Sequence, residues 1–237
     1  MNSLLLCELH AHTTWSDGYL TLTELVDLYG ESGFDVLCVT DHSVRLEDPT
    51  PNAVDAWTWP AYLAAVQAEA ARARTQYDLL VIPGLELSDN HDDPDRSAHV
   101  LALGLERHIS VDPGIVAALE AANDERAALI AAHPYANDDV TPLRATRRIA
   151  REPETFRSLI HRYELFNRSE VFGWVAEAGL LPVATGDVHR SEHLASWKTL
   201  LPCEKDAGAV VDYLRSAGRV CLMPFALDRR EALPAAA

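Results

Sequence analysis

The chain has 237 residues, of which 48% are hydrophobic and 24% are charged. This length predicts one large domain or two small ones, and the composition excludes a chain that is disordered throughout. The net charge of −16 disfavours extended binding to DNA or RNA, because an acidic surface repels phosphate backbones. The sequence contains no run of eighteen apolar residues, so we expect no membrane span.

The N-terminal residues and the cysteines together predict a cytoplasmic location. Residues 1–10 lack the basic segment that opens a signal peptide. The four cysteines are widely spaced, and three of them fall in apolar, strand-like stretches, which favours buried free thiols over disulfides. They are Cys7, Cys38, Cys203 and Cys221.

Short apolar runs alternate with helical stretches along the chain. The first strand is expected at residues 4–9, and Thr21 with Glu24 has the form of a capping box that begins a helix ending near Gly33. Later strands are expected at residues 36–40, 79–83, 98–103, 129–132, 163–166, 182–185 and 219–222. Later helices are expected at residues 60–76, 111–128, 171–179 and 207–217.

This alternation of strand and helix, repeated about seven times, is typical of a parallel α/β sheet or barrel. We find no repeat or linker, so we expect a single domain over residues 1–237, with its core at about 4–222. The Asp-rich residues 89–96 predict a surface loop, residues 46–59 an irregular segment, and residues 234–237 a frayed tail.

Histidines and acidic residues gather at the ends of the predicted strands. The carboxyl ends of parallel strands converge on one face of an α/β fold, where active sites are built. His10 and His12 alternate along an extended chain, so both can reach one ion. The residues at such positions are His10, His12, Asp17, His42, Glu86, His99, His133, Asp187 and His189.

These nine side chains predict a metal centre. One divalent ion takes about four to six ligands, so nine ligands suit three ions that share a carboxylate, and imidazole with carboxylate suits zinc, iron or manganese. A lone histidine or a single HxH pair is more often structural, and it is the whole set that favours metal. The other four histidines are assigned structural roles, with His193 left open because it follows His189 by four residues: His91, His108, His161 and His193.

The nine positions, with Thr40 and Asp41 before His42, resemble the PHP (polymerase and histidinol phosphatase) superfamily. The resemblance implies a distorted (β/α)7 barrel with a trinuclear metal site at the carboxyl ends of its strands, which hydrolyses phosphate esters. It also implies three ligand sets: His10, His12, Glu86 and Asp187 for the first ion; Glu86, His99 and His133 for the second; Asp17, His42 and His189 for the third.

The mechanism implied by the resemblance is attack on phosphorus by a metal-bridging hydroxide, held by Glu86 and the other ligands, while the third ion binds phosphate oxygens. Asp41 is either a carboxylate that orients a ligand histidine or a turn residue. Arginine forks suit phosphate, so Arg190, Arg45 and Arg168 are candidates for substrate binding. Glu164 and Asn167 receive no role.

The substrate class stays open between several alternatives. Only 33 residues separate His99 from His133, which leaves no room for a lid domain. Residues 46–59 could form a local lid, in which Trp57 and Trp59 stack on a substrate or simply pack against the next helix. We do not predict an oligomeric state, although a homo-oligomer whose second subunit closes the site is compatible with the sequence.

We expect a phosphate monoester of a small molecule, such as a nucleotide, sugar or amino-alcohol phosphate. A phosphodiesterase acting on a small cyclic or nucleotide substrate is the alternative. An amidohydrolase or a non-catalytic metal-binding domain is less favoured. The only lysines, Lys198 and Lys205, lie outside the predicted strand ends, which counts against an amidohydrolase with a modified bridging lysine.

Overall fold

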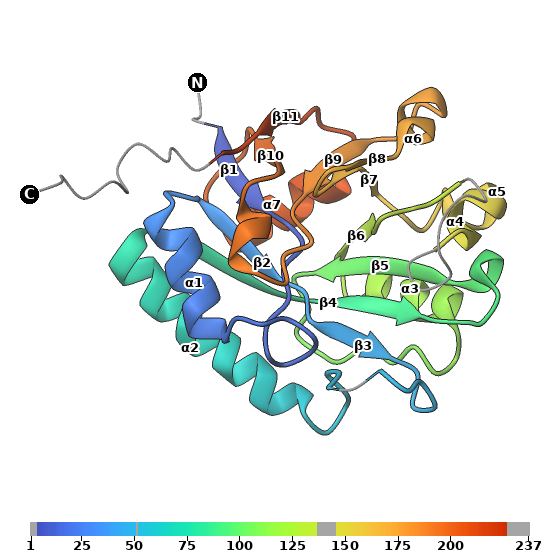
Figure 1. The fold of residues 1–237 in the computed structure, drawn as a ribbon, viewed down its shortest axis with the longest axis horizontal. Helices are drawn as coiled ribbons and strands as arrows, with labels where there is room; N and C mark the ends of the chain where they lie inside the picture. The colour runs from blue at the N-terminus through green and yellow to red at the C-terminus, as the bar shows by residue number, and fades with distance from the viewer. Residues whose placement is uncertain (1–3, 51, 137–145, 227–237) are drawn as a thin grey trace, which may run out of the picture.

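The computed structural model describes residues 4–50, 52–136 and 146–226, so the expected frayed tail at 234–237 lies outside the described residues. A curled mixed sheet runs through the molecule and helices pack around it (Figure 1). The strands are β1 (Leu5–Glu8), β2 (Val36–Val39), β3 (His42–Val44), β4 (Leu80–Asp89), β5 (Ala98–Leu103), β6 (Ala128–Ala131), β7 (Arg162–Asn167), β8 (Glu170–Val171), β9 (Pro182–Thr185), β10 (Trp197–Leu201) and β11 (Cys221–Pro224).

Most of the helices begin and end close to where the sequence predicts them. They are α1 (Leu22–Glu31), α2 (Trp59–Tyr77), α3 (Ile115–Asp124), α4 (Arg148–Arg151), α5 (Pro153–Phe156), α6 (Gly173–Glu177) and α7 (Ala207–Arg215), with 3-10 turns η1 (Pro94–Arg96) and η2 (Ser191–Leu194). The predicted capping box of α1 is present, with Thr21 and Glu24 bonding reciprocally. Helix α3 is shorter than predicted, because Gly114 has a left-handed φ of +96° and β6 already begins at Ala128.

The strand order is β11-β10-β1-β2-β4-β5-β6-β7-β8, with β3 beside β4 and β9 beside β7. The prediction of an α/β fold with a distorted barrel is confirmed, but the expectation of a wholly parallel sheet is wrong. Strand β5 is antiparallel to both β4 and β6. Its first residues therefore lie where β4 ends, with His99 opposite Ser88. This reversal explains how a histidine at the start of a strand reaches the same edge as residues at the ends of others.

Two contacts accompany the curling of the sheet into a partial barrel. One joins the residues after β9 to those after β1, and the other joins β9 to β10. Val188 forms an isolated parallel bridge with Ala11, in which the His12 amide donates to the Val188 carbonyl at 2.8 Å. The Thr199 hydroxyl on β10 donates to the Ala184 carbonyl on β9 at 2.8 Å. The segment that follows β1 therefore lies directly beside the segment that follows β9.

Strand β10 is missing from the sequence-based prediction, which places Lys198 outside any strand. The structure corrects this. Lys198 is fully buried within β10, antiparallel to β1, and its ammonium lies 2.5 Å from the carboxylate of Glu8. Strand β10 begins with Trp197, Lys198 and Thr199, and this sequence carries a weak strand signal because the lysine interrupts the expected apolar pattern.

The apolar core lies on both faces of the sheet. Helices α1 and α2 lie together on one side of it (Figure 1). All four cysteines are free, but the expectation that they are buried holds only for Cys7 and Cys38, since Cys203 is partly accessible and Cys221 is exposed. Among the described residues, no helix combines the length and apolar character needed to cross a lipid bilayer.

Candidate metal centre

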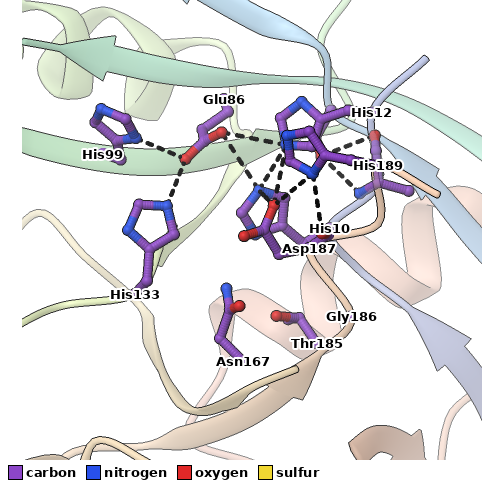
Figure 2. Close-up of polar contacts among 12 residues, drawn as sticks. His10, His12, Glu86, His99, His133, Asn167, Thr185, Gly186, Asp187 and His189 are labelled. Atoms are coloured by element: carbon purple, nitrogen blue, oxygen red, sulfur yellow. Dashed lines mark hydrogen bonds and ion pairs between the residues drawn. The ribbon is translucent and has the colours of Figure 1, made fainter. Parts of the chain in front are cut away.

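The residues after β1 supply two imidazoles that converge on one point. The Nε2 atoms of His10 and His12 lie 2.9 Å apart. Each is 3.3 Å from Oε2 of Glu86 and 3.5 Å from Oδ1 of Asp187. Figure 2 shows these four side chains pointing toward one another. Two nitrogens and two carboxylate oxygens that face a common point are a donor set suited to a divalent metal ion.

Glu86 lies at the centre of the cluster, within β4, with one oxygen toward each side. Oε1 lies 2.9 Å from Nδ1 of His99 and 3.2 Å from Nε2 of His133. Oε2 is buried and has imidazole nitrogens of His10, His12 and His42 around it at 3.0–3.3 Å, in a geometry that forms no hydrogen bond. A buried carboxylate oxygen without a well-aligned hydrogen bond is costly, and a cation would satisfy it. The carboxylate therefore has imidazole nitrogens of the cluster beside both of its oxygens.

A third group of donors lies at the outer side of the cluster. Asp17, His42 and His189 come from three separate segments, and Oδ1 of Asp17 lies 3.5 Å from Nε2 of His42 and 3.1 Å from Nε2 of His189. Their donor atoms, with one from His12, all lie within 4.8 Å of one another. The donor sets overlap more than the sequence suggests, because Nδ1 of His42 also lies 3.0 Å from Oε2 of Glu86.

The titration behaviour of the cluster reflects its charges. Burial alone would lower the pKa of His10, but the carboxylates of Asp187 and Glu86 outweigh burial and raise it well above its ordinary value. The pKa of His42 is raised to about 10, since Glu86 and Asp17 likewise outweigh burial. Burial would raise the pKa of Glu86, but the surrounding histidines hold it well below the usual range. In the metal-free protein, the raised pKa values of His10 and His42 thus favour protonated imidazoles that offset part of the carboxylate charge.

The cluster opens into a cleft of about 620 Å³. Expected ligands form part of its lining, and Tyr19, Tyr135, Arg168, Arg190 and His193 contribute to the rest. This volume suits a small molecule, since ligand pockets typically measure about 300–1,000 Å³.

A model of the PHP domain family matches residues 8–167 of this chain. The chain belongs to the PHP domain family. The match covers more than half of the sequence and includes seven of the nine expected ligands, up to His133. The prediction that the chain is a member of the PHP family is confirmed. None of the curated proteins compared with the sequence matches it.

Solved structures share the fold of this PHP chain at low identity. A two-domain protein from Bacteroides vulgatus, described as containing a predicted PHP-like metal-dependent phosphoesterase, is 19% identical with a TM-score of 0.65. The alignment covers 94% of this chain and 65% of that protein. PsfC from Pseudomonas syringae is 15% identical, with 95% and 93% covered and a TM-score of 0.58.

An amidohydrolase from Chromobacterium violaceum, solved with sulfate and without metal, is 16% identical, with 77% and 87% covered and a TM-score of 0.54. At these identities the likeness shows the fold alone.

The three arginines expected near the mouth of the PHP domain differ in their surroundings. Arg168 lines the cleft, donates from Nε to the Asp187 carbonyl at 2.8 Å, and pairs with the Asp187 carboxylate at 2.8 Å. Arg190 is exposed at the cleft, where its guanidinium lies 4.0 Å from the centre of the Tyr19 ring. Arg45 is not among the described lining residues, since it pairs with Asp89 and donates to the Asn90 carbonyl.

Asp41 lies behind the site rather than in contact with a ligand ring. Its carboxylate accepts from the Thr13 amide at 2.8 Å and from the Ser16 hydroxyl at 2.6 Å. The Ser16 oxygen lies 3.4 Å from Nδ1 of His12, so Asp41 acts on His12 only through Ser16.

The tryptophans of residues 46–59 do not line the described cleft. Trp59 is buried and packs against Tyr62 at the start of α2, whereas Trp57 is 91% exposed. His193 lines the cleft and accepts from the His189 amide at Nδ1. The remaining three histidines, His91, His108 and His161, contact Asp89, Ser43 and Leu129 respectively and lie outside the cleft's described lining.

Glu164 and Asn167 of β7 lie near a predicted strand end, but the sequence does not reveal what they contact. Glu164 is fully buried against His10 and His133, although no motif in a single sequence assigns it there. The available signal is the acidic residue and the amide at the carboxyl end of an apolar strand, where PHP ligands also gather.

Proposed function

We propose that this PHP domain is a metal-dependent phosphomonoesterase that acts on a small molecule, such as a nucleotide, sugar or amino-alcohol phosphate. The observation that carries the proposal is Glu86. One of its oxygens faces His99 and His133, and the other is buried without a hydrogen bond between His10 and His12. This is the arrangement of a carboxylate shared by two metal ions.

We infer three divalent ions, of manganese, iron or zinc, with the ligand sets that the family resemblance implies. When bound, such ions stabilise charge on phosphate oxygens and ionise water near neutral pH. His10, His12, Glu86 and Asp187 would hold the first ion; Glu86, His99 and His133 the second; Asp17, His42 and His189 the third.

The arginines would bind the phosphate that enters the cleft. Arg190 is exposed, and its guanidinium is held over the ring of Tyr19, so its planar fork is oriented before a substrate arrives. Arg168 is tied to Asp187, and its role is to hold that carboxylate toward the ligands as well as to add positive charge. Arg45 is already paired with Asp89, and we do not retain it as a phosphate-binding residue.

The monoester is favoured over a nucleic acid or another long substrate. A cleft of about 620 Å³ accommodates a small phosphate ester, and a chain with a net charge of −16 offers no long basic track for a polyanion. A small cyclic or nucleotide diester is the second candidate, because the exposed side chains at the cleft leave room beside the phosphate.

The test compares an aryl phosphate monoester with the matching diester, using protein that has been depleted of metal and reloaded with Mn²⁺, Fe²⁺ or Zn²⁺. We expect metal-dependent turnover of the monoester, with Glu177→Gln, an exposed residue of α6, as the unaffected control. Turnover of the diester alone would contradict the phosphomonoesterase and favour the phosphodiesterase. Hydrolysis of neither ester by any metal-loaded form would overturn it.

A further inference from the structure

A fully buried carboxylate, that of Glu164, contacts the ligand cluster and is not among the described residues that line the cleft. We propose that Glu164 is a positioning residue that fixes His10 and His133 together as metal ligands and thereby controls the two inner ions but not the outer one. The inference rests on the proposed metal centre, and its test separates the two claims.

One oxygen of Glu164 sets the orientation of the His10 ring. Oε1 lies 2.8 Å from Nδ1 of His10 and accepts the Thr185 hydroxyl at 2.7 Å. An ionised carboxylate only accepts, so Nδ1 of His10 carries the proton of this bond. Nε2 then faces Glu86 and Asp187, which lie 3.3 and 3.5 Å away, and it is the nitrogen that would ligate a metal ion held between them. A carboxylate on the far nitrogen of an imidazole also strengthens it as a metal ligand.

The other oxygen of Glu164 holds the backbone of His133. Oε2 accepts from the His133 amide at 2.6 Å and from the Asn167 side-chain amide at 2.7 Å. His133 has a φ of +31°, in the left-handed region that residues with a β-carbon rarely adopt. From this backbone its Nε2 reaches Oε1 of Glu86 at 3.2 Å. The hydrogen bond to Glu164 thus stabilises the conformation that brings the ring to the site.

Glu164 is a support and not itself a ligand. Its two oxygens accept four hydrogen bonds, and the side chain is fully buried. Asn167 and Thr185, two of its partners, lie beside His133 and His10 in Figure 2. None of these four hydrogen bonds involves Asp17, His42 or His189, which form the outer donor group.

A glutamine cannot replace this carboxylate. Its oxygen could accept two of the four bonds, but its NH₂ group would then face donors, either the His133 and Asn167 amides or the His10 ring and the Thr185 hydroxyl. Glu164→Gln therefore breaks one half of the arrangement with almost no change in volume. Aspartate keeps the charge and both oxygens but is one methylene shorter, so it restores part of the function.

The experiment titrates the metal-depleted full chain with Co²⁺ and follows visible absorbance and the number of ions bound. For Glu164→Gln we expect about 10- to 100-fold weaker binding of two ions and an altered spectrum, with the third ion unchanged. Glu164→Asp should recover part of the affinity and of the spectrum, and Glu177→Gln should match the wild type.

Wild-type affinity and spectrum in a folded Glu164→Gln variant would overturn the inference, and so would equal weakening of all three ions. If Glu164→Gln does not fold, Thr185→Val decides, since it removes one donor to Oε1 and leaves the charge. Weaker binding of only the inner ions would support the inference, and unchanged binding would overturn it. Because the readout is metal binding, a wild type that binds three ions without hydrolysing any ester contradicts the proposed function alone.

Discussion

Glu86 is the single residue on which the chemistry of the site depends most. It contacts five expected ligands from four segments of the chain, and its Oε2 is buried. We expect Glu86→Gln to bind at least two fewer ions and to lower kcat by about 10³-fold or more, since metal ions supply several kcal/mol of transition-state stabilisation. The check is kcat together with ions per chain. A variant that keeps three ions and wild-type turnover would contradict the bridging role.

His42 predicts a pH dependence for the stability of the metal-free protein. Its folded-state pKa of about 10 lies above the unfolded value of about 6.5, so the folded protein holds its proton more tightly. The resulting stabilisation is fully present below pH 6.5 and is lost as the pH rises toward 10. We expect the free energy of unfolding in urea to fall over this interval in metal-free protein. A smaller fall in His42→Asn than in the wild type would assign part of the effect to this residue, since His10 with its raised pKa still contributes in the variant. Equal profiles in the two proteins, or a flat wild-type profile, would contradict it.

The two cleft arginines should separate in steady-state kinetics. Arg190 is exposed and its guanidinium lies over the ring of Tyr19. Arg190→Lys should therefore raise KM about tenfold with little change in kcat, through loss of two-pronged phosphate binding. Arg168 is paired with Asp187, so Arg168→Lys should lower kcat as well. Arg74→Lys, an exposed change on α2, is the control. Equal effects on KM and kcat in both variants would contradict this division.

At the scale of the elements, much of the site follows from the sequence because each ligand has a local signal. His10, His12, Asp187 and His189 lie beside predicted strand ends, and the structure brings them together there. The direction of β5 and the existence of β10 do not follow, since both depend on long-range pairing that no local pattern encodes. The contacts of Glu164 are hidden for the same reason.

The ion pair between Lys198 of β10 and Glu8 of β1 also depends on long-range strand pairing. Lys198 contacts the carboxylate of Glu8, which also accepts from the backbone amides of His10 and Gly186. Lys198→Met should destabilise the protein by about 3–5 kcal/mol, because it leaves the Glu8 carboxylate buried without the positive charge of its partner. Urea unfolding measures this, with Lys205→Met expected to cost about 1 kcal/mol or less at a more accessible pair. A loss below 1 kcal/mol in Lys198→Met would show that the pair is not needed.

At the scale of the whole molecule, the acidic charge restricts the substrate. A net charge of −16 repels polyanions, so single- and double-stranded oligonucleotides should not inhibit turnover of a small monoester at physiological salt. Inhibition assays with both, and with a nucleoside monophosphate for comparison, check this. Competitive inhibition by a long oligonucleotide at concentrations where the monophosphate has no effect would contradict the small-molecule assignment.

Because three donor groups lie around Glu86, the number of bound ions is the most direct test of the proposed metal centre. The measurement is elemental analysis of the full chain after reconstitution and removal of loosely bound metal. We expect about three Mn, Fe or Zn ions per chain, and fewer in Glu86→Gln. One ion or none after reconstitution would contradict a trinuclear centre and return the chain to the amidohydrolase and non-catalytic alternatives.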